Sequence, residues 1–219
     1  MSKQPDADIP TVIVIDDDEG VRESLRGLFG SVGLATDIYG SVREFTAGGR
    51  SDRPGCMVLD IRLPGQSGLE FHEMLASAGG RRPVILISAH VDVPMSVRAM
   101  KAGAVDVLTK PVREQDLLEA VHRAIEQDAK GRAEAKQRGT LKVRYATLTQ
   151  REREIMALVV TGAQNKKIAA QTSITEATVK LHRGHVMQKM AAGSLPELVR
   201  MADELSYGCL TAQPKPDRN

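Results

Sequence analysis

The sequence predicts a parallel α/β domain followed by a smaller all-helical domain. In the first half, short aliphatic runs alternate with segments whose apolar residues recur at helical spacing, which is typical of a parallel sheet covered by helices. In the second half only helical spacing remains. The charge changes too: residues 1–125 carry 14 Lys and Arg against 18 Asp and Glu, and residues 126–219 carry 16 against 10. This difference suggests different partners, with nucleic acid a candidate for the second half, although a solvated surface gives the same balance.

Composition narrows the class of protein. Aromatic residues make up 3% of the 219 residues, so the core must consist of Val, Leu, Ile, Ala and Met, which suits parallel sheets and helix bundles better than a β-sandwich. The two cysteines, Cys56 and Cys209, do not support a disulfide scaffold, and no secretory leader is recognisable. No apolar run approaches the ~18 residues of a membrane span. We therefore expect a cytoplasmic protein with no membrane partner.

A single carboxylate ends a continuous apolar run in the first half of the chain. Cys56–Leu59 leads directly into Asp60, and Pro64 and Gly65 follow closely. Such a run is typical of a strand buried on both faces, and ligands bind at the carboxyl ends of strands in open α/β sheets. Taken alone, Asp60 is better explained as an Asp that caps the next turn, so the interpretation depends on its neighbours.

A second aliphatic run, Thr11–Ile15, leads into Asp16, Asp17, Asp18 and Glu19. Like charges at one strand end disfavour one another, and a hard divalent cation relieves this, because Mg²⁺ prefers carboxylate oxygens. A solvated acidic turn at the start of the next helix is the alternative. With Asp60 expected at a neighbouring strand end, the metal site is the favoured interpretation.

The remaining elements of the first half alternate as this fold requires. Ser41 to Glu44 and Ser67 to Glu70 have the spacing of capping boxes that open helices. Further strands are predicted at Ala35–Tyr39, Pro83–Ser88 and Ala104–Thr109, and helices at Val21–Val32, Met95–Ala102 and Leu117–Ile125. The result is a doubly wound, parallel, five-stranded sheet with helices on both faces.

Four predicted strand ends then carry polar groups: the Asp16 pair, Asp60, Ser88 and, just after the last strand, Lys110. Considered singly, Ser88 is explained as a capping residue, and Lys110 as a surface lysine whose ammonium lies in solvent. Together, carboxylates for Mg²⁺, a nucleophilic carboxylate, a hydroxyl and an ammonium supply what phosphoryl transfer onto an aspartate requires.

On these residues, the segment 11–128 resembles a receiver domain of two-component signalling, which has the CheY-like flavodoxin fold. The resemblance implies that a sensor histidine kinase is the partner and that Asp60 is the phosphoacceptor. It also implies a set of supporting residues. These are Asp17, Asp60 and the backbone carbonyl of Arg62 as Mg²⁺ ligands with Asp16 in support, Ser88 as the switch hydroxyl, Lys110 joined to Pro111 by a cis bond, and Pro64 and Gly68 in the loop after the acceptor.

Val107 departs from the receiver pattern. Receivers usually carry Tyr or Phe three residues before the Lys, and the ring swings inward when the switch hydroxyl moves; Val107 has no ring. Our hypothesis is that phosphorylation still moves Ser88 and the loop His90–Pro94, and that the change is transmitted through the backbone and helix packing.

The boundaries of the terminal segments and of the linker between the domains are predicted from composition. Residues 1–10 and the tail 206–219 are polar and expected to be disordered. Residues 129–146 are polar and helix-prone, but Gly131 and Gly139 interrupt them, which predicts a partly helical linker.

Four helices are predicted between residues 147 and 205. Thr149 and Glu152 have capping-box spacing, Asn165 is expected to cap Lys166–Gln171, and Thr175 is expected to cap Glu176–Met190; Ser194–Leu205 completes the set. Two helices joined by a tight turn suit a helix-turn-helix, although spacing alone fits a small helical bundle equally well.

The motifs Leu148-Thr149-x-Arg151-Glu152, Asn165-Lys166-Lys167-Ile168-Ala169 and Thr178-Val179-Lys180-x-His182 resemble the LuxR-type DNA-binding domain of the NarL/FixJ family, in its FixJ-like branch. The resemblance implies that Glu176–Met190 is the recognition helix and that duplex DNA is a partner. His182 is equally a phosphate contact or a packed ring. The implied DNA contacts are Lys166, Lys167, Thr178, Lys180, Leu181, Arg183 and Lys189. The implied dimer surface is Leu195, Leu198, Val199 and Ala202.

Two glycines depart from this family's pattern. Gly184 lies on the groove-facing side of the predicted recognition helix, and Gly193 stands where Arg is common. Because neither supplies a side-chain contact, we expect modest base readout and reliance on dimeric binding.

The resulting expectation is a transcriptional response regulator, not an enzyme. Mg²⁺-dependent phosphorylation of Asp60 would produce receiver dimers that bind promoters. A phosphatase with a nucleophilic Asp is disfavoured, because phosphatases of that type place a second Asp two residues on, where this chain has Arg62. A receiver that regulates DNA binding without phosphate remains the alternative. Val107 supports this alternative, because it lacks the ring that usually moves on phosphorylation.

Overall fold

The computed structural model describes residues 9–48 and 52–210, with the side chains of 206–210 excepted. The chain forms two compact units, Met1–Arg132 and Ala133–Asn219. Most of the expected N-terminal segment 1–10 and of the tail 206–219 lies outside the described residues. Within the described part, no helix is long and apolar enough to cross a membrane.

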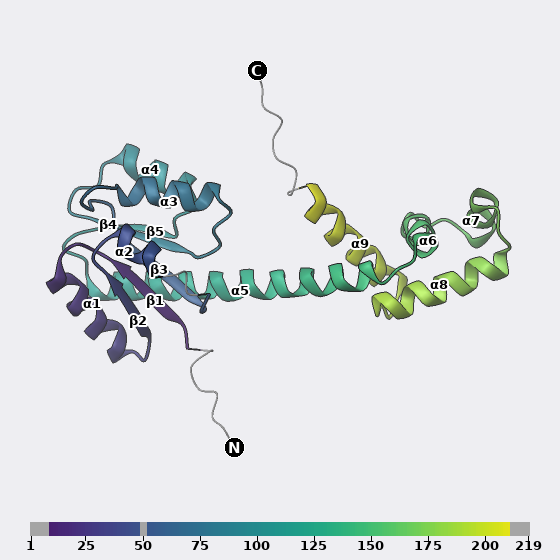
Figure 1. Cartoon of the computed structure of the whole chain (residues 1–219), viewed down its shortest axis with the longest axis horizontal. Coiled ribbons are helices and arrows are strands. Elements are labelled where there is room, and N and C mark those ends of the chain that lie inside the picture. Colours follow the sequence, from purple (N-terminus) through teal and green to yellow (C-terminus); the bar gives the residue numbers. More distant parts are fainter. Residues whose placement is uncertain (1–8, 49–51, 211–219) are drawn as a thin grey trace, which may run out of the picture. The chain divides into compact units, whose positions relative to one another are not determined.

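The first unit contains the predicted five-stranded parallel sheet (Figure 1). The strands are β1 (Thr11–Ile15), β2 (Ala35–Tyr39), β3 (Gly55–Asp60), β4 (Val84–Ser88) and β5 (Asp106–Thr109). Their order is β2-β1-β3-β4-β5, so the chain crosses over between β2 and β3. Val14 pairs with Val58, and Asp60 pairs with Ile87, which brings the carboxyl ends of the central strands to one edge. The doubly wound fold is confirmed.

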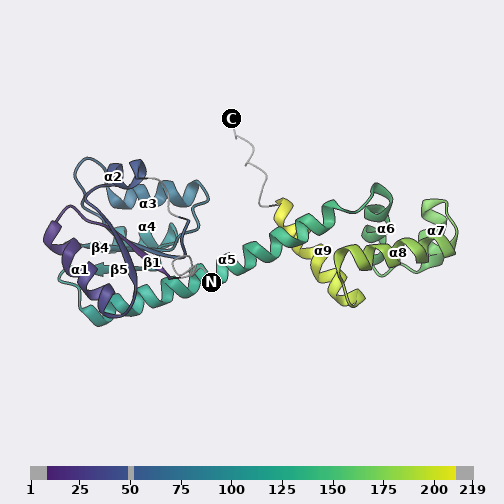
Figure 2. The same cartoon turned by 60° about the horizontal axis from the view of Figure 1, so that its bottom comes forward.

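Helices cover both faces of the sheet (Figures 1 and 2). Helices α2 (Val42–Ala47), α3 (Gly68–Ser77) and α4 (Val93–Lys101) pack on one face, and α1 (Glu19–Ser31) and the start of α5 (Glu114–Ala146) pack on the other. Alternate strand residues serve the two cores: Ile13 and Leu59 contribute to the first, and Val14 and Val58 to the second. The central strands are therefore buried on both sides, as their unbroken apolar runs predicted.

Two predicted capping boxes form differently. The Ser41 side chain accepts from the backbone N–H of Glu44, but the Glu44 carboxylate accepts from the backbone N–H of Gly40, at 2.6 Å, one residue earlier than the motif requires. Ser67 precedes α3 without a side-chain capping bond. The helix starts were therefore predicted correctly, but neither capping box forms as predicted: one contact is present at Ser41, and the Ser67 side chain makes none.

The expected interruption of the linker was wrong. Helix α5 continues through Gly131 and Gly139 to Ala146, and the division between the two units falls inside it. A helical Gly costs about 1 kcal/mol relative to Ala, but good helix formers surround both glycines. Burial near each end of the helix, at Val121 and at Leu141, adds packing energy that the polar sequence between them does not indicate.

The second unit contains the remaining helices, α6 (Gln150–Val160), α7 (Asn165–Thr172), α8 (Glu176–Met190) and α9 (Leu195–Leu210). The capping box at Thr149 and the cap at Thr175 are both present. Asn165 is the first residue of α7 instead of its cap, and its side-chain oxygen accepts from Arg183 at 2.7 Å. Helix α9 continues five residues beyond the predicted end at Leu205.

Candidate functional site

Three carboxylates and one ammonium meet at the carboxyl edge of the sheet in the first unit. Asp16 follows β1 and Asp60 ends β3, and their exposed fractions are only 3% and 6%. Lys110, which follows β5, lies between them: its Nζ is 2.7 Å from Asp16 Oδ2 and 2.5 Å from Asp60 Oδ2. The bond between Lys110 and Pro111 is cis, as expected. The structure thus brings together residues that are 94 positions apart in the sequence.

Backbone contacts fix the orientation of both buried carboxylates. Asp16 Oδ1 accepts from the Asp18 N–H at 3.0 Å, and Asp60 Oδ1 accepts from the Arg62 N–H at 2.8 Å. Arg22 donates to the Asp16 carbonyl at 2.7 Å. In each acid, one oxygen is therefore held by the backbone, and the other faces Lys110.

The electrostatics follow from burial and pairing. Burial raises the pKa of Asp16 above its ordinary value, although the Lys110 hydrogen bond opposes this shift. Burial acts to lower the pKa of Lys110, but its hydrogen bonds to Asp16 and Asp60 outweigh this, so the pKa is raised. At neutral pH Lys110 stays charged and neutralises part of the acid cluster.

The acid cluster fits a magnesium ion. Asp16, Asp17 and Asp60 each offer one carboxylate oxygen, and these oxygens lie within 4.8 Å of one another. Asp17 is exposed, and it lines a cavity of about 560 Å³ together with the loop from Ile61 to Ser67. Because hard carboxylate oxygens are Mg²⁺ ligands and the cavity gives access from solvent, the donor set suits this cation.

Gly68 shows why the loop after Asp60 carries a glycine. Its N–H donates to the Ile61 carbonyl at 2.9 Å, and a Cβ atom at this position would collide with the backbone carbonyl of Asp60. Only glycine therefore allows α3 to begin so close to the strand that carries Asp60.

Ser88 and Val107 lie on the neighbouring strands. Ser88 is fully buried at the end of β4, and its hydroxyl donates to the His90 carbonyl at 3.0 Å. The Lys110 N–H donates to the Ser88 carbonyl at 2.8 Å, so the two predicted switch residues are joined through the backbone. Val107 pairs with Leu86 on β4 and packs, partly buried, against the core beneath α2, α3 and α4.

In the second unit, α7 and α8 form the predicted two-helix element. The chain turns between them at Ser173, which has the left-handed φ of 54°. Ile168 and Val179 are buried in the shared core, and Lys166, Lys167 and Lys180 are exposed. Leu181 is 58% exposed although it is apolar, as expected for a side chain that reads a partner surface.

Three other predicted DNA contacts are already engaged within the protein. Lys189 Nζ lies 2.6 Å from Glu152 Oε2, Arg183 donates to Asn165, and Thr178 is hydrogen-bonded to Thr175 at 2.8 Å. To contact DNA, each of these side chains would have to exchange its internal partner, and all three stay predictions. Sequence reasoning treated Glu152 only as a capping residue and missed this ion pair, because Lys189 lies 37 residues away.

The predicted dimer surface needs a correction. Leu198 has an exposed fraction of 0% and belongs to the core of its own unit, so it cannot contact a second chain in this conformation. Leu195, at 36%, is exposed, whereas Ala202 packs partly buried against the core. The helical spacing of apolar residues predicted the buried stripe of α9 and could not separate it from a dimer surface.

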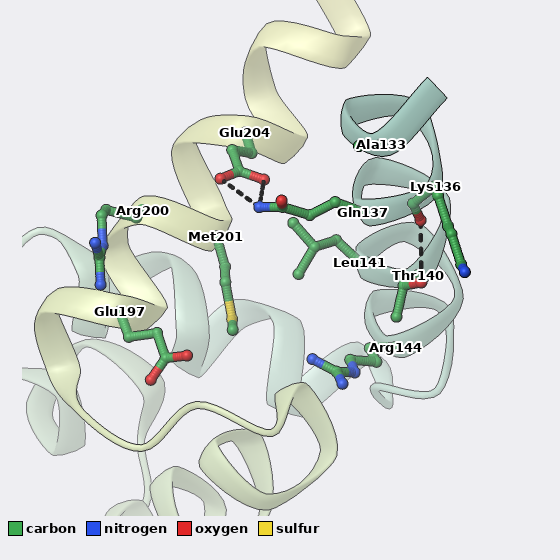
Figure 3. Close-up of a pocket in the computed structure, with 10 residues that line it drawn as sticks. All are labelled: Ala133, Lys136, Gln137, Thr140, Leu141, Arg144, Glu197, Arg200, Met201 and Glu204. Carbon is green, nitrogen blue, oxygen red and sulfur yellow. Dashed lines mark hydrogen bonds between the residues drawn. The ribbon is translucent and has the colours of Figure 1, made fainter. Parts of the chain in front are cut away.

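The second unit also has a cavity of about 600 Å³ between the C-terminal part of α5 and α9 (Figure 3). Gln137 donates to both carboxylate oxygens of Glu204 at 3.2 Å across one end of it. Leu141 and Met201 form its apolar part, and Arg144, whose guanidinium donates to the Met190 carbonyl at 3.2 Å, lines the other end. These contacts tie the last turns of α5 to the helical unit.

Comparison with known families assigns both units. Residues 12–122 match the response regulator receiver domain, and residues 146–202 match the luxR family of bacterial regulatory proteins. The chain belongs to the NarL/FixJ family of response regulators. Within this FixJ-like group, it is a two-component transcriptional response regulator with a receiver and a LuxR-type helix-turn-helix domain.

Several relatives share both domains. Nodulation protein W of Bradyrhizobium diazoefficiens is 48% identical over 194 residues, which cover 89% of this chain and 86% of that protein. Transcriptional regulatory protein FixJ of Rhizobium meliloti is 42% identical and covers 90% and 97%. The structure of response regulator StyR matches with a TM-score of 0.80 and 41% identity, covering 90% of this chain and 99% of StyR.

Proposed function

We propose that this response regulator is activated by Mg²⁺-dependent phosphorylation of Asp60 by a sensor histidine kinase, and that the phosphorylated protein dimerises and binds promoter DNA. The observation that carries the proposal is the buried Asp60 carboxylate beside Lys110 at 2.5 Å, within 4.8 Å of two further acids. An Asp with a purely structural role is not expected to lie buried beside an ammonium and two further carboxylates.

The chemistry follows from these contacts. A carboxylate oxygen of Asp60 forms a bond to the phosphorus of the donor, and the bond from phosphorus to the donor's leaving atom breaks. Lys110 would neutralise charge on the incoming phosphoryl group, and Asp17, Asp60 and the Arg62 carbonyl, supported by Asp16, would hold Mg²⁺. The bound cation would supply further charge neutralisation to the transferring group.

The response would begin at Ser88. Its hydroxyl is bound to the His90 carbonyl, at the start of the loop that leads to α4. A phosphoryl group on Asp60 offers new acceptor oxygens, and if the Ser88 hydroxyl donated to one of them, its bond to the His90 carbonyl would break. Because Val107 has no ring to move, the change would reach the surface through this loop and the packing of α4.

The test compares the wild-type protein with Asp60→Asn after treatment with a small acyl-phosphate donor and Mg²⁺. We expect the wild type to gain the mass of one phosphoryl group, to shift to a dimer in size-exclusion chromatography and to retain promoter DNA more tightly, and Asp60→Asn to do none of these. Equal behaviour of the two proteins would remove the phosphorylation mechanism and leave DNA binding intact.

For DNA recognition, we expect Lys180→Ala to weaken specific binding by about 1–3 kcal/mol and to relax sequence preference. Lys180 is exposed on α8, and we propose that it contacts base edges. Lys167→Ala should weaken specific and non-specific DNA similarly and reduce the salt dependence by about one counterion. Fluorescence anisotropy at several salt concentrations measures both. Lys142→Ala, which removes an exposed lysine on α5, serves as the control.

A phosphorylation-independent regulator is the second candidate, and Val107 at the usual aromatic position favours it. In that case, the acyl-phosphate donor would phosphorylate Asp60 in the wild type without changing its oligomeric state or its retention of DNA.

A further inference from the structure

A cluster of two histidines and one glutamate lies between α6 and α8, and the proposed function does not use it. His182 and His185 are three residues apart on α8 and therefore point to the same side of the helix. Their rings lie 6.4 Å apart between centroids. Glu152 comes from α6, and its carboxylate and the two imidazoles offer three ligand atoms that all lie within 4.8 Å of one another.

Glu152 is held so that one of its oxygens faces the histidines. The residue is 3% exposed, and its Oε2 accepts from the Thr149 N–H at 2.8 Å and from Lys189 Nζ at 2.6 Å. Its Oε1 lies 3.6 Å from His185 Nδ1, which is too long for a hydrogen bond. The carboxylate is thus oriented in advance, with Oε1 directed towards an imidazole that it does not bind directly.

His182 provides an independent observation. Its Nδ1 is enclosed by protein atoms, and among the described residues it has no hydrogen-bond partner. Buried polar atoms in proteins are nearly always satisfied, so an unsatisfied ring nitrogen beside a second imidazole and a carboxylate suggests a missing ligand.

We propose that Glu152, His182 and His185 bind one divalent cation of the Zn²⁺ class. Imidazole nitrogens suit Zn²⁺ and similar late transition metals, whereas Mg²⁺ and Ca²⁺ prefer an all-oxygen set such as that of the receiver. Bonds of about 2.0–2.2 Å require the ligand atoms to draw closer together than they lie in the free protein. His185 is exposed and can turn towards the ion, and a water molecule would complete the coordination.

The ion would join the recognition helix α8 to α6 through three bonds. Lys189 stays on the Oε2 side of Glu152, and its positive charge opposes that of the cation, so we expect moderate affinity. The site needs neither phosphate nor DNA, and its test is therefore independent of the proposed function.

The test titrates Zn²⁺ into the full chain at pH 7.5 by calorimetry, with saturating Mg²⁺ present to occupy the receiver carboxylates. All proteins carry Cys209→Ser, which leaves the buried Cys56 as the remaining cysteine. We expect one Zn²⁺ per chain, an affinity at least about tenfold lower in His185→Gln, and an unchanged affinity in His122→Gln, which replaces an exposed histidine of α5.

Co²⁺ gives a second readout, which reports the ligand set around the ion. Co²⁺ bound by two imidazoles and a carboxylate should show a visible absorption band in the wild type and none in His185→Gln. Equal Zn²⁺ affinity in the wild type and His185→Gln, or the absence of any Zn²⁺ uptake by the wild type, would overturn the proposal. Either result would leave Glu152 and His185 as a structural contact alone.

Discussion

Replacing Lys189 by methionine should lower the free energy of unfolding of the C-terminal unit by about 2 kcal/mol at pH 7. The change leaves the buried Glu152 carboxylate without the ammonium that lies 2.6 Å away. Breaking a buried ion pair costs about 3–5 kcal/mol, but the Lys189 side chain is 36% exposed and the Thr149 N–H still binds the carboxylate, so the smaller value is expected. Urea unfolding followed by circular dichroism measures the difference.

The pH dependence of this effect has a definite sign. The hydrogen bond from Lys189, together with those from Thr149, lowers the pKa of Glu152 from an ordinary 4.5 to about 2 in the folded protein. A lowered folded-state pKa contributes stability that is complete above pH 4.5 and is lost as the pH falls towards 2. The difference between wild type and Lys189→Met should therefore shrink below pH 4.5. Lys142→Met, which changes an exposed lysine, should match the wild type; if Lys189→Met also matched it at pH 7, the pair would be energetically unimportant.

The receiver acid site could be anticipated from the sequence because its residues end strands. An aliphatic run fixes a buried parallel strand, and the carboxyl ends of such strands meet at one edge, so Asp16, Asp60 and Lys110 had to converge. The orientation of Ser88 could not be anticipated in the same way. Its hydroxyl binds a carbonyl two residues ahead, and this choice depends on the path of the loop and not on the strand.

Packing between residues far apart in the sequence explains the other differences between the predictions and the structure. The continuity of α5 depends on packing at Val121 and Leu141, which outweighs two local glycine penalties. Leu198 and the exposed Leu195 are the same residue type on one amphipathic helix, and only the folded unit shows that Leu198 is fully enclosed. Glu152 was recognised through its capping motif, but its partner Lys189 comes from another helix. Periodicity identifies elements, whereas pairings between elements require the tertiary structure.

The other large effect is expected at the receiver, where Lys110→Met should lower the free energy of unfolding by about 3 kcal/mol at pH 7 without Mg²⁺. The change leaves Asp16 and Asp60, both nearly buried, beside Asp17 with no ammonium between them. Like-charge repulsion and burial then act together against folding. Lys101→Met, on the exposed side of α4, should be neutral.

Acid and Mg²⁺ should each restore stability to Lys110→Met, and for the same reason. Burial already raises the pKa of Asp16 above its ordinary 3.8 in the wild type, and loss of Lys110 raises it further. An acid with a raised folded-state pKa destabilises the protein at high pH, and this cost falls as the pH drops through that pKa. Mg²⁺ should raise the melting temperature of Lys110→Met more than that of the wild type, because the ammonium no longer competes for the carboxylates. Equal Mg²⁺ stabilisation of both proteins would show that Lys110 and the cation do not share these oxygens.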